Sequence, residues 1–284
     1  MNIPKLSVIN DEISDNFDES LKFLVSNHID YVELRYIGNK NILDCTIEEI
    51  NNIKEKLDRN NIQVSAIASP LFKWCPESDN QDTRDLTHND LMFGFNKYIP
   101  KHTKIDYIMK AFVVAKIFET KYVRIFSLIK SEGQENDSFW NEESDLYELA
   151  LTQARDNHID LLLENGLSTY FYSTSQILNF KNLYGDNYKL LLDIGNTYVI
   201  GQPIGINDFE KTVDSIEYIH LKDFDEKNKA VVELGKGDIP YKSLFRILLK
   251  NGYDGFFSIE PEGKENKIDL VQNSINYLRQ LEVA

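Results

Sequence analysis

Eight short apolar runs are distributed along the chain, separated by longer segments of mixed polarity. Short continuous runs of this kind are typical of strands that are buried on both faces, as in parallel sheets. We therefore predict strands at Leu6–Ile9, Tyr31–Leu34, Val64–Ala68, Tyr122–Phe126, Leu161–Leu163, Leu190–Leu192, Tyr218–Leu221 and Phe256–Ile259.

The segments between these runs have helical character. Thr46 and Glu49 have the spacing of a capping box at the start of one such segment. Its apolar residues lie roughly on one helical face, at Ile47, Ile50, Ile53 and Leu57. Strands that alternate with helices indicate parallel βαβ units, and eight such pairs predict an α/β fold with one closed (β/α)8 TIM barrel as a single domain over residues 1–284.

Residues 69–103 interrupt this alternation after the third predicted strand, because they contain no clear strand. Loops of this length in compact domains are often lids or binding loops. The segment could be a disordered surface insertion, but it is rich in aromatic residues: Phe72, Trp74, Phe93, Phe95 and Tyr98. We therefore predict that the insertion forms a wall of a substrate site.

The charge of the chain limits its partners. Its 46 acidic and 31 basic residues give a formal net charge of −15, which argues against nucleic acid and against an anionic membrane surface as partners. The sequence shows neither a signal peptide nor a membrane-spanning run. Two cysteines, Cys45 and Cys75, are too few for a disulfide framework. We therefore expect a reduced, cytoplasmic protein.

Four residues that could bind a metal lie at the ends of the last four predicted strands. They are Glu164, Asp193, His220 and Glu260. A single strand-end carboxylate could simply cap a backbone amide or pair with a lysine, but three carboxylates and an imidazole at the ends of consecutive strands favour a shared site. Three carboxylates packed together would repel one another without a cation. Oxygen-rich ligation with one nitrogen suits Mn²⁺, Mg²⁺ or Co²⁺, and zinc remains possible.

The residues beside these candidates suggest further roles. Lys222 could bind a substrate oxygen, or it could pair with Asp223 or Glu226. Asp223 could hydrogen-bond a metal ligand. By contrast, His28 and His158 precede strands in similar Asn-His-Ile-Asp sequences, at joints expected on the opposite face of the barrel. We therefore predict a structural role for both histidines.

Several short motifs, in this order, resemble the xylose-isomerase-like TIM-barrel superfamily, and more closely its sugar phosphate isomerase/epimerase branch. The motifs are ELR at 33–35, VRIFS at 123–127, LLEN at 162–165, LDIGN at 192–196, HLKD at 220–223, GKGDI at 235–239 and GYDGFFSIEPE at 252–262. The resemblance implies one divalent metal ion, often manganese, held by residues at four strand ends. Carried over by position, these ligands are Glu164, Asp193, His220 and Glu260.

The same resemblance implies proton abstraction next to a carbonyl through an enediolate, with Glu164 and Glu260 as acid and base. Ketose 3-epimerases of this branch usually have a histidine three residues after the metal-binding aspartate. This chain has Asn196, which can hydrogen-bond a hydroxyl but cannot exchange a proton near neutral pH. We expect a small-molecule carbohydrate substrate, and the predicted contact residues are Asn196, Lys222, Trp74, Phe72 and Arg124.

Several functions remain open at this point. The leading prediction is a metal-dependent sugar isomerase or epimerase. Loss of a β-hydroxyl from the same enediolate would instead give a dehydratase, acting on a sugar or an inosose. A non-catalytic carbohydrate-binding protein is a further alternative. A DNA-repair endonuclease of the same barrel class is disfavoured. Such an enzyme needs several histidines for a zinc cluster and a basic face for DNA, whereas this chain has only five histidines and a net charge of −15. Barrels of this kind often pair, so a homo-oligomer is possible.

Overall fold

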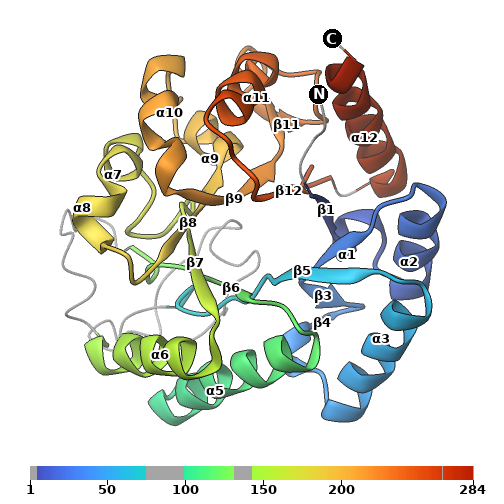
Figure 1. Cartoon of the computed structure of the whole chain (residues 1–284), viewed down its shortest axis with the longest axis vertical. Helices are drawn as coiled ribbons and strands as arrows, with labels where there is room; N and C mark the ends of the chain where they lie inside the picture. Colours follow the sequence, from blue (N-terminus) through green and yellow to red (C-terminus); the bar gives the residue numbers. More distant parts are fainter. Residues whose placement is uncertain (1–4, 75–98, 131–142, 264, 284) are drawn as a thin grey trace.

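The computed structural model describes residues 5–74, 99–130, 143–263 and 265–283. Within these ranges, eight parallel strands close into a barrel in the order β1-β12-β9-β8-β7-β6-β5-β2, and helices surround it (Figure 1). The barrel strands are β1 (Leu6–Ile9), β2 (Tyr31–Leu34), β5 (Gln63–Ile67), β6 (Tyr122–Ile125), β7 (Asp160–Glu164), β8 (Lys189–Asp193), β9 (Ile216–Leu221) and β12 (Phe256–Ile259). The predicted (β/α)8 barrel and all eight predicted strands are confirmed.

Helices follow most of the strands and form the outer layer. They are α1 (Asn10–Ile13), α2 (Phe17–Ser26), α3 (Ile47–Arg59), α5 (Lys101–Ile117), α6 (Ser144–Asn157), α7 (Thr174–Leu178), α8 (Phe180–Tyr184), α9 (Ile194–Val199), α10 (Ile206–Thr212), α11 (Tyr241–Lys250) and α12 (Lys267–Val283). Short 3-10 helices span Ile42–Asp44 and Val213–Ser215. Two small hairpins, β3 (Tyr36–Ile37) with β4 (Lys40–Asn41) and β10 (Asp223–Asp225) with β11 (Ala230–Val232), extend loops beyond the strands.

Side chains alternate between the inside and the outside of the barrel, as the period of a strand requires. In β7, Leu161 and Leu163 belong to the large core between the strands and the helices. Leu162, between them, belongs to a separate cluster with Leu191, Tyr218 and other residues of the barrel interior. Both faces of the strand are therefore buried, which explains why β7 reads as a continuous apolar run.

The joints between helices and strands use left-handed backbone conformations. His28, Asn61 and His158 have φ values of 53°, 55° and 55°, and Gly252 has 74°. His158 is the C-terminal cap of α6, and its backbone N–H donates to the carbonyl of Ala154. Because these residues end helices at the amino ends of the strands, His28 and His158 have the structural role that we predicted.

Helix α3 begins with the predicted capping box, in which the side chain of Thr46 accepts the Glu49 N–H and the side chain of Glu49 accepts the Thr46 N–H. Ile50, Ile53 and Leu57 are buried against the barrel. The prediction that Ile47 shares this face is wrong, because its side chain is 48% exposed. Ile47 is the first residue of the helix, where the chain has not yet reached the core.

The predicted insertion follows β5, and its residues 75–98, including Phe93, Phe95 and Tyr98, lie outside the described residues. Phe72 and Trp74, at its start, are buried. The Phe72 ring stacks on Tyr147 of α6 with centroids 3.9 Å apart, and Trp74 Nε1 donates to Glu143 Oε2 at 2.6 Å. Both rings are thus held by protein contacts, and their contact with a substrate stays a prediction. No helix within the described ranges is long and apolar enough to cross a membrane.

Candidate metal centre at the carboxyl ends of the barrel strands

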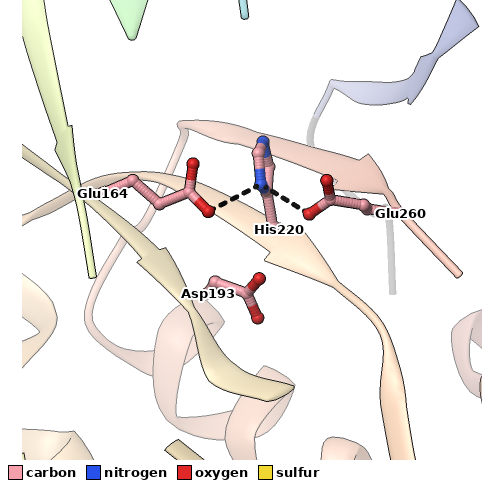
Figure 2. A group of neighbouring side chains, drawn as sticks. All are labelled: Glu164, Asp193, His220 and Glu260. Carbon is pink, nitrogen blue, oxygen red and sulfur yellow. Dashed lines mark ion pairs between the residues drawn. The ribbon is translucent and has the colours of Figure 1, made fainter. Parts of the chain in front are cut away.

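The four candidate ligands lie together at one end of the barrel. Glu164, Asp193, His220 and Glu260 each offer one ligand atom, and these four atoms lie within 4.8 Å of one another. All four side chains are buried. Figure 2 shows the carboxylates of Glu164 and Glu260 on opposite sides of His220, with Asp193 beside them.

The alternation within the strands explains this convergence. Glu164 and Asp193 are the last residues of β7 and β8, and each lies two positions after a leucine that faces the barrel interior. Asp193 is also the register partner of His220 in β9. Side chains of the same phase on neighbouring parallel strands point into the same space. Glu164 and Asp193 occupy the next inward-facing positions of their strands after these leucines, so their side chains enter a shared site.

His220 uses its two ring nitrogens for different purposes. Nε2 lies 3.1 and 3.0 Å from the two carboxylate oxygens of Glu33, a fully buried residue of β2. Nδ1 lies 3.0 Å from Glu260 Oε2 and 3.9 Å from Glu164 Oε1. A histidine that donates one N–H to a carboxylate presents the lone pair of its other nitrogen to a metal. The geometry therefore assigns Nδ1 as the ligand atom.

Glu33 is itself held by a column of polar groups inside the barrel. Tyr218 Oη donates to Glu33 Oε2 at 3.0 Å, and Ser65 Oγ lies 2.8 Å from Tyr218 Oη. Ser7 Oγ lies 2.7 Å from Ser65 Oγ. Burial would raise the pKa of Glu33, but His220 lowers it below its ordinary value. Glu33 is thus an ionised acceptor that fixes the orientation of the imidazole.

Each of the three carboxylate ligands also has a cationic neighbour. The pairs are Arg124 Nη1 with Glu164 Oε2 at 3.1 Å, Lys222 Nζ with Asp193 Oδ2 at 2.8 Å, and Arg35 Nη1 with Glu260 Oε1 at 2.6 Å. These cations lower the repulsion among the buried carboxylates. They come from β6 and from the residues that follow β9 and β2, so the site draws on most of the barrel.

Each of the four candidate ligands has one buried side-chain atom whose hydrogen-bonding capacity is unused. Glu164 Oε2, Asp193 Oδ2, His220 Nδ1 and Glu260 Oε2 are buried and lack a hydrogen-bond partner. Glu164 Oε2 and Asp193 Oδ2 lie within ion-pair distance of Arg124 and Lys222, and His220 Nδ1 and Glu260 Oε2 lie 3.0 Å apart, but none of these contacts has the geometry of a hydrogen bond. A buried polar atom without a partner costs roughly 1–3 kcal/mol. One such atom from each of four converging residues fits a shared divalent ion, and three carboxylates with one imidazole suit a hard cation.

The pKa values of the ligands reflect the same crowding. Burial raises the pKa of Asp193 to about 7, with Lys222 opposing this shift and Glu260 and Glu164 adding to it. Burial acts in the same direction on Glu260, but His220, Lys222 and Arg35 hold the pKa of Glu260 well below its ordinary value. Burial would lower the pKa of His220, but Glu33 and Glu260 raise it well above its ordinary value.

Lys222 and Asp223 differ from what we expected. Lys222 pairs with Asp193 and Glu262, so the predicted pairing with Asp223 or Glu226 is wrong. Asp223 contacts no candidate ligand. Its carboxylate accepts the backbone N–H of Phe224, the next residue of β10, and those of Gly235, Gly237 and Ile239 in the loop before α11. A Cβ on Gly237 would lie 2.2 Å from Asp223 Oδ1, so this glycine lets the loop wrap closely around the carboxylate.

Asn165 and Asn196 fasten the loops after β7 and β8. Asn165 exchanges two hydrogen bonds with the backbone of Asp193, through Nδ2 at 2.9 Å and Oδ1 at 2.8 Å. Asn196 Nδ2 donates to the Asn165 carbonyl, whereas Asn196 Oδ1 is buried and lacks a hydrogen-bond partner. Asn196, Lys222 and Arg124 thus lie beside the candidate ligands, and their contact with a substrate stays a prediction.

Several residues of the site were not identified as functional from the sequence. They are Asp11, Glu12, Glu33, Arg35, Asn165 and Glu262. A signal existed for Glu33, because a carboxylate interrupts the otherwise apolar predicted strand Tyr31–Leu34 one residue before its end. Asp11 and Glu12 lie in a short helix after β1 that has no such pattern.

Comparisons with known proteins agree on the fold. A family model for the xylose isomerase-like TIM barrel matches residues 21–281. A curated relative named inosose dehydratase, from Clostridium perfringens (strain 13 / Type A), is 19% identical over 244 residues, which are 80% of this chain and 76% of the relative. A crystal structure of the probable 3-DHS dehydratase AsbF from Bacillus anthracis has a TM-score of 0.70 at 17% identity, with 97% of this chain and 98% of that chain covered. A structure of the IOLI protein with a zinc atom has a TM-score of 0.71 at 17% identity, with 98% and 97% covered.

Proposed function

The chain belongs to the xylose isomerase-like TIM barrel family, and we propose that it is a divalent-metal-dependent dehydratase of a small polyhydroxylated ketone. The observation that carries this proposal is the cluster of four buried residues whose ligand atoms lie within 4.8 Å of one another, each residue also having one buried atom without a hydrogen-bond partner. The name of the Clostridium perfringens relative supports dehydration as the reaction.

Glu164, Asp193, His220 and Glu260 are the proposed ligands. A divalent ion at this site supplies Lewis-acid stabilisation for negative charge that develops beside a substrate carbonyl. Glu164 is the proposed base that removes the proton next to that carbonyl. Its carboxylate is held less tightly than that of Glu260, because Oε2 lies within ion-pair distance of Arg124 but accepts no hydrogen bond. The buried Asn196 Oδ1 is a proposed acceptor for a substrate hydroxyl.

The two glutamates are not equivalent, and this favours dehydration. Glu260 Oε1 accepts a hydrogen bond from Arg35 at 2.6 Å, and its pKa is held well below the ordinary value. A carboxylate held in this way is a poor proton donor. Epimerisation needs proton removal on one face and return on the other, whereas dehydration needs one base and an acid for the leaving hydroxyl. One carboxylate, that of Glu164, is therefore sufficient as the base.

Isotope incorporation distinguishes the reactions. The metal-loaded protein is incubated with an inosose and with free and phosphorylated ketoses in deuterated water. We expect a dehydrated product that carries one fewer water than the substrate, and we expect both chelation and Glu164→Gln to abolish its formation. Exposed Lys236→Gln serves as the control variant. Binding of the sugar without any deuterium exchange or product would indicate a non-catalytic carbohydrate-binding protein and would refute the proposal.

Epimerisation of a ketose is the second candidate. It is favoured by the placement of the Glu164 and Glu260 carboxylates on opposite sides of His220 (Figure 2). An epimerase would return recovered sugar with solvent deuterium at the reacting carbon and inverted configuration, without loss of water. That result would replace dehydration by epimerisation and leave the proposed metal site unchanged.

A further inference from the structure

The buried guanidinium of Arg35 connects Glu260, a candidate metal ligand, to helix α1, which contributes no candidate ligand. Arg35 follows β2 directly. Its Nη1 donates to Glu260 Oε1 at 2.6 Å, after β12. Its Nε donates to both oxygens of Asp11 at 3.0 and 3.1 Å, and its Nη2 donates to Asp11 Oδ2 at 2.8 Å and also to Glu12 Oε1. Asp11 and Glu12 both belong to α1, the four-residue helix after β1.

Asn10, which precedes Asp11 and Glu12 in α1, holds this helix against the end of β2. Asn10 Oδ1 accepts the backbone N–H of Arg35 at 2.9 Å, and Asn10 Nδ2 donates to the carbonyl of Tyr36. The pairing of β1 with β2 ends at Ile9 and Glu33. Beyond that point, the side-chain amide of Asn10 bonds to the backbone that follows β2, in place of a further strand residue. The carboxylates of Asp11 and Glu12 are therefore presented to Arg35 at a defined position.

The consequence for Glu260 is that its two oxygens have different surroundings. Oε1 is occupied by Arg35, whereas Oε2 has no hydrogen-bond partner and lies 3.0 Å from His220 Nδ1. The segment after Glu260 is held as well, because Glu12 Oε2 accepts the backbone N–H of Glu262 at 2.9 Å. Glu262 has a left-handed φ of 53°, a conformation that a non-glycine residue keeps only when its surroundings impose it.

We propose that Asp11, Glu12 and Arg35 form a positioning network that presents Glu260 to a bound divalent ion through one oxygen, Oε2. This inference rests on the proposed metal site. A glutamate side chain samples several rotamers when it is unrestrained, so fixing it in advance removes an entropic cost from metal binding. Arg35 acts through Glu260 and is a positioning residue, and the acidic residues of α1 act through Arg35.

Cobalt(II) titration tests this network, because the visible absorption of bound Co²⁺ reports its ligand geometry. The variants are Asp11→Asn, which weakens the hold on Arg35 without touching Glu260, and Arg35→Lys, which keeps the charge but loses the planar fork. Asp18→Asn is the matched control, because Asp18 lies nearby in α2 but its exposed side chain pairs with Lys56, outside the network. We expect ten- to hundredfold weaker Co²⁺ binding and an altered spectrum in both variants, and no change in the control.

The outcomes separate this inference from the proposed function. If the unmodified protein binds no Co²⁺, the proposed metal site fails and the network has nothing to position. If the unmodified protein binds Co²⁺ and both variants keep its affinity and spectrum, the network is structural only and the inference is overturned. Circular dichroism of the metal-free proteins checks folding, and Asp11→Asn keeps the test decisive if Arg35→Lys does not fold.

Discussion

Lys73 is a buried cation on the loop after β5. Its ammonium lies 5.0 Å from the centroid of the Phe126 ring, and the guanidinium carbon of Arg124 lies 4.8 Å from the same ring. Burial lowers the pKa of Lys73 to about 8, with the attraction of Glu164 opposing the shift. A lysine with a lowered pKa is a suitable acid near neutral pH. Lys73 also shares the Phe126 ring with Arg124, the partner of Glu164, so within the proposed dehydration we expect Lys73 to donate the proton that the leaving hydroxide needs.

Replacement of this lysine should separate the two halves of the reaction. In Lys73→Gln we expect dehydration to fall by about 100-fold, because a positioned general acid contributes on this order. Deuterium exchange next to the carbonyl should continue, because Glu164 still removes that proton. Mass spectrometry of substrate and product in deuterated water measures both rates. A parallel loss of exchange and dehydration would show that Lys73 does not act as the leaving-group acid.

Asp193 should make the metal-free protein sensitive to pH. Its pKa in the folded state is raised from 3.8 to about 7, so between these values the folded protein holds a proton that the unfolded chain releases. The contribution of Asp193 to stability is therefore greatest below pH 4 and falls as the pH rises towards 7. Between pH 5 and pH 7 we expect the free energy of unfolding of the metal-free wild type to fall by about 2 kcal/mol more than that of metal-free Asp193→Asn.

Urea denaturation of both metal-free proteins across this pH range measures the difference. Glu12, whose pKa burial also raises to about 7, is present in both proteins and cancels in the comparison. Parallel stability curves for the two proteins would contradict the assignment of this pH dependence to Asp193.

At the scale of elements, local patterns predicted the strands and the start of α3 well. The apolar runs at β1, β2 and β12 have the predicted bounds, because a strand buried on both faces leaves a continuous signal in the sequence. The capping box of α3 was likewise readable, because its two hydrogen bonds join residues three apart. Helix α1 was not predicted, because four residues are too few to show a helical period.

Removal of the α3 cap should affect stability alone. Thr46→Ala removes the acceptor for the Glu49 N–H, and we expect a loss of about 1 kcal/mol in the free energy of unfolding. Metal affinity should not change, because α3 begins on the outside of the barrel, away from the ligand cluster. Urea denaturation and Co²⁺ titration measure the two quantities. A weaker metal affinity would show that the position of α3 is coupled to the site.

At the scale of the whole molecule, the ligand cluster links four strands, so a bound ion should stabilise the entire barrel. A ligand that binds only the folded state stabilises it by RT ln(1 + [L]/Kd), or about 4 kcal/mol at 1,000 times Kd. We expect the chelated protein to gain thermal stability on addition of Mn²⁺, Co²⁺, Mg²⁺ or Zn²⁺, in the order of their affinities. Scanning calorimetry measures the shift.

Glu33→Gln provides the comparison variant, because Glu33 contacts His220 but is not one of the candidate ligands. At equal metal concentration, the gain in thermal stability should be smaller for Glu33→Gln than for the wild type, because the imidazole of His220 is less firmly oriented in the variant. Equal shifts for the two proteins would show that Glu33 does not support metal binding. The cytoplasmic location and the formation of a homo-oligomer stay predictions.

The sequence by itself determined the barrel and the candidate ligands. Local apolar runs indicate the strands, and a polar residue at the end of such a run enters the barrel mouth when it continues the alternation of the interior side chains. Only the tertiary structure decided how these ligands are held. Glu33 meets His220, and Arg35 joins Asp11 to Glu260, a residue 225 positions away, at the point where β1, β2 and β12 close the barrel. These partners depend on which strands become neighbours and on the register between them, and no local pattern of residues encodes that.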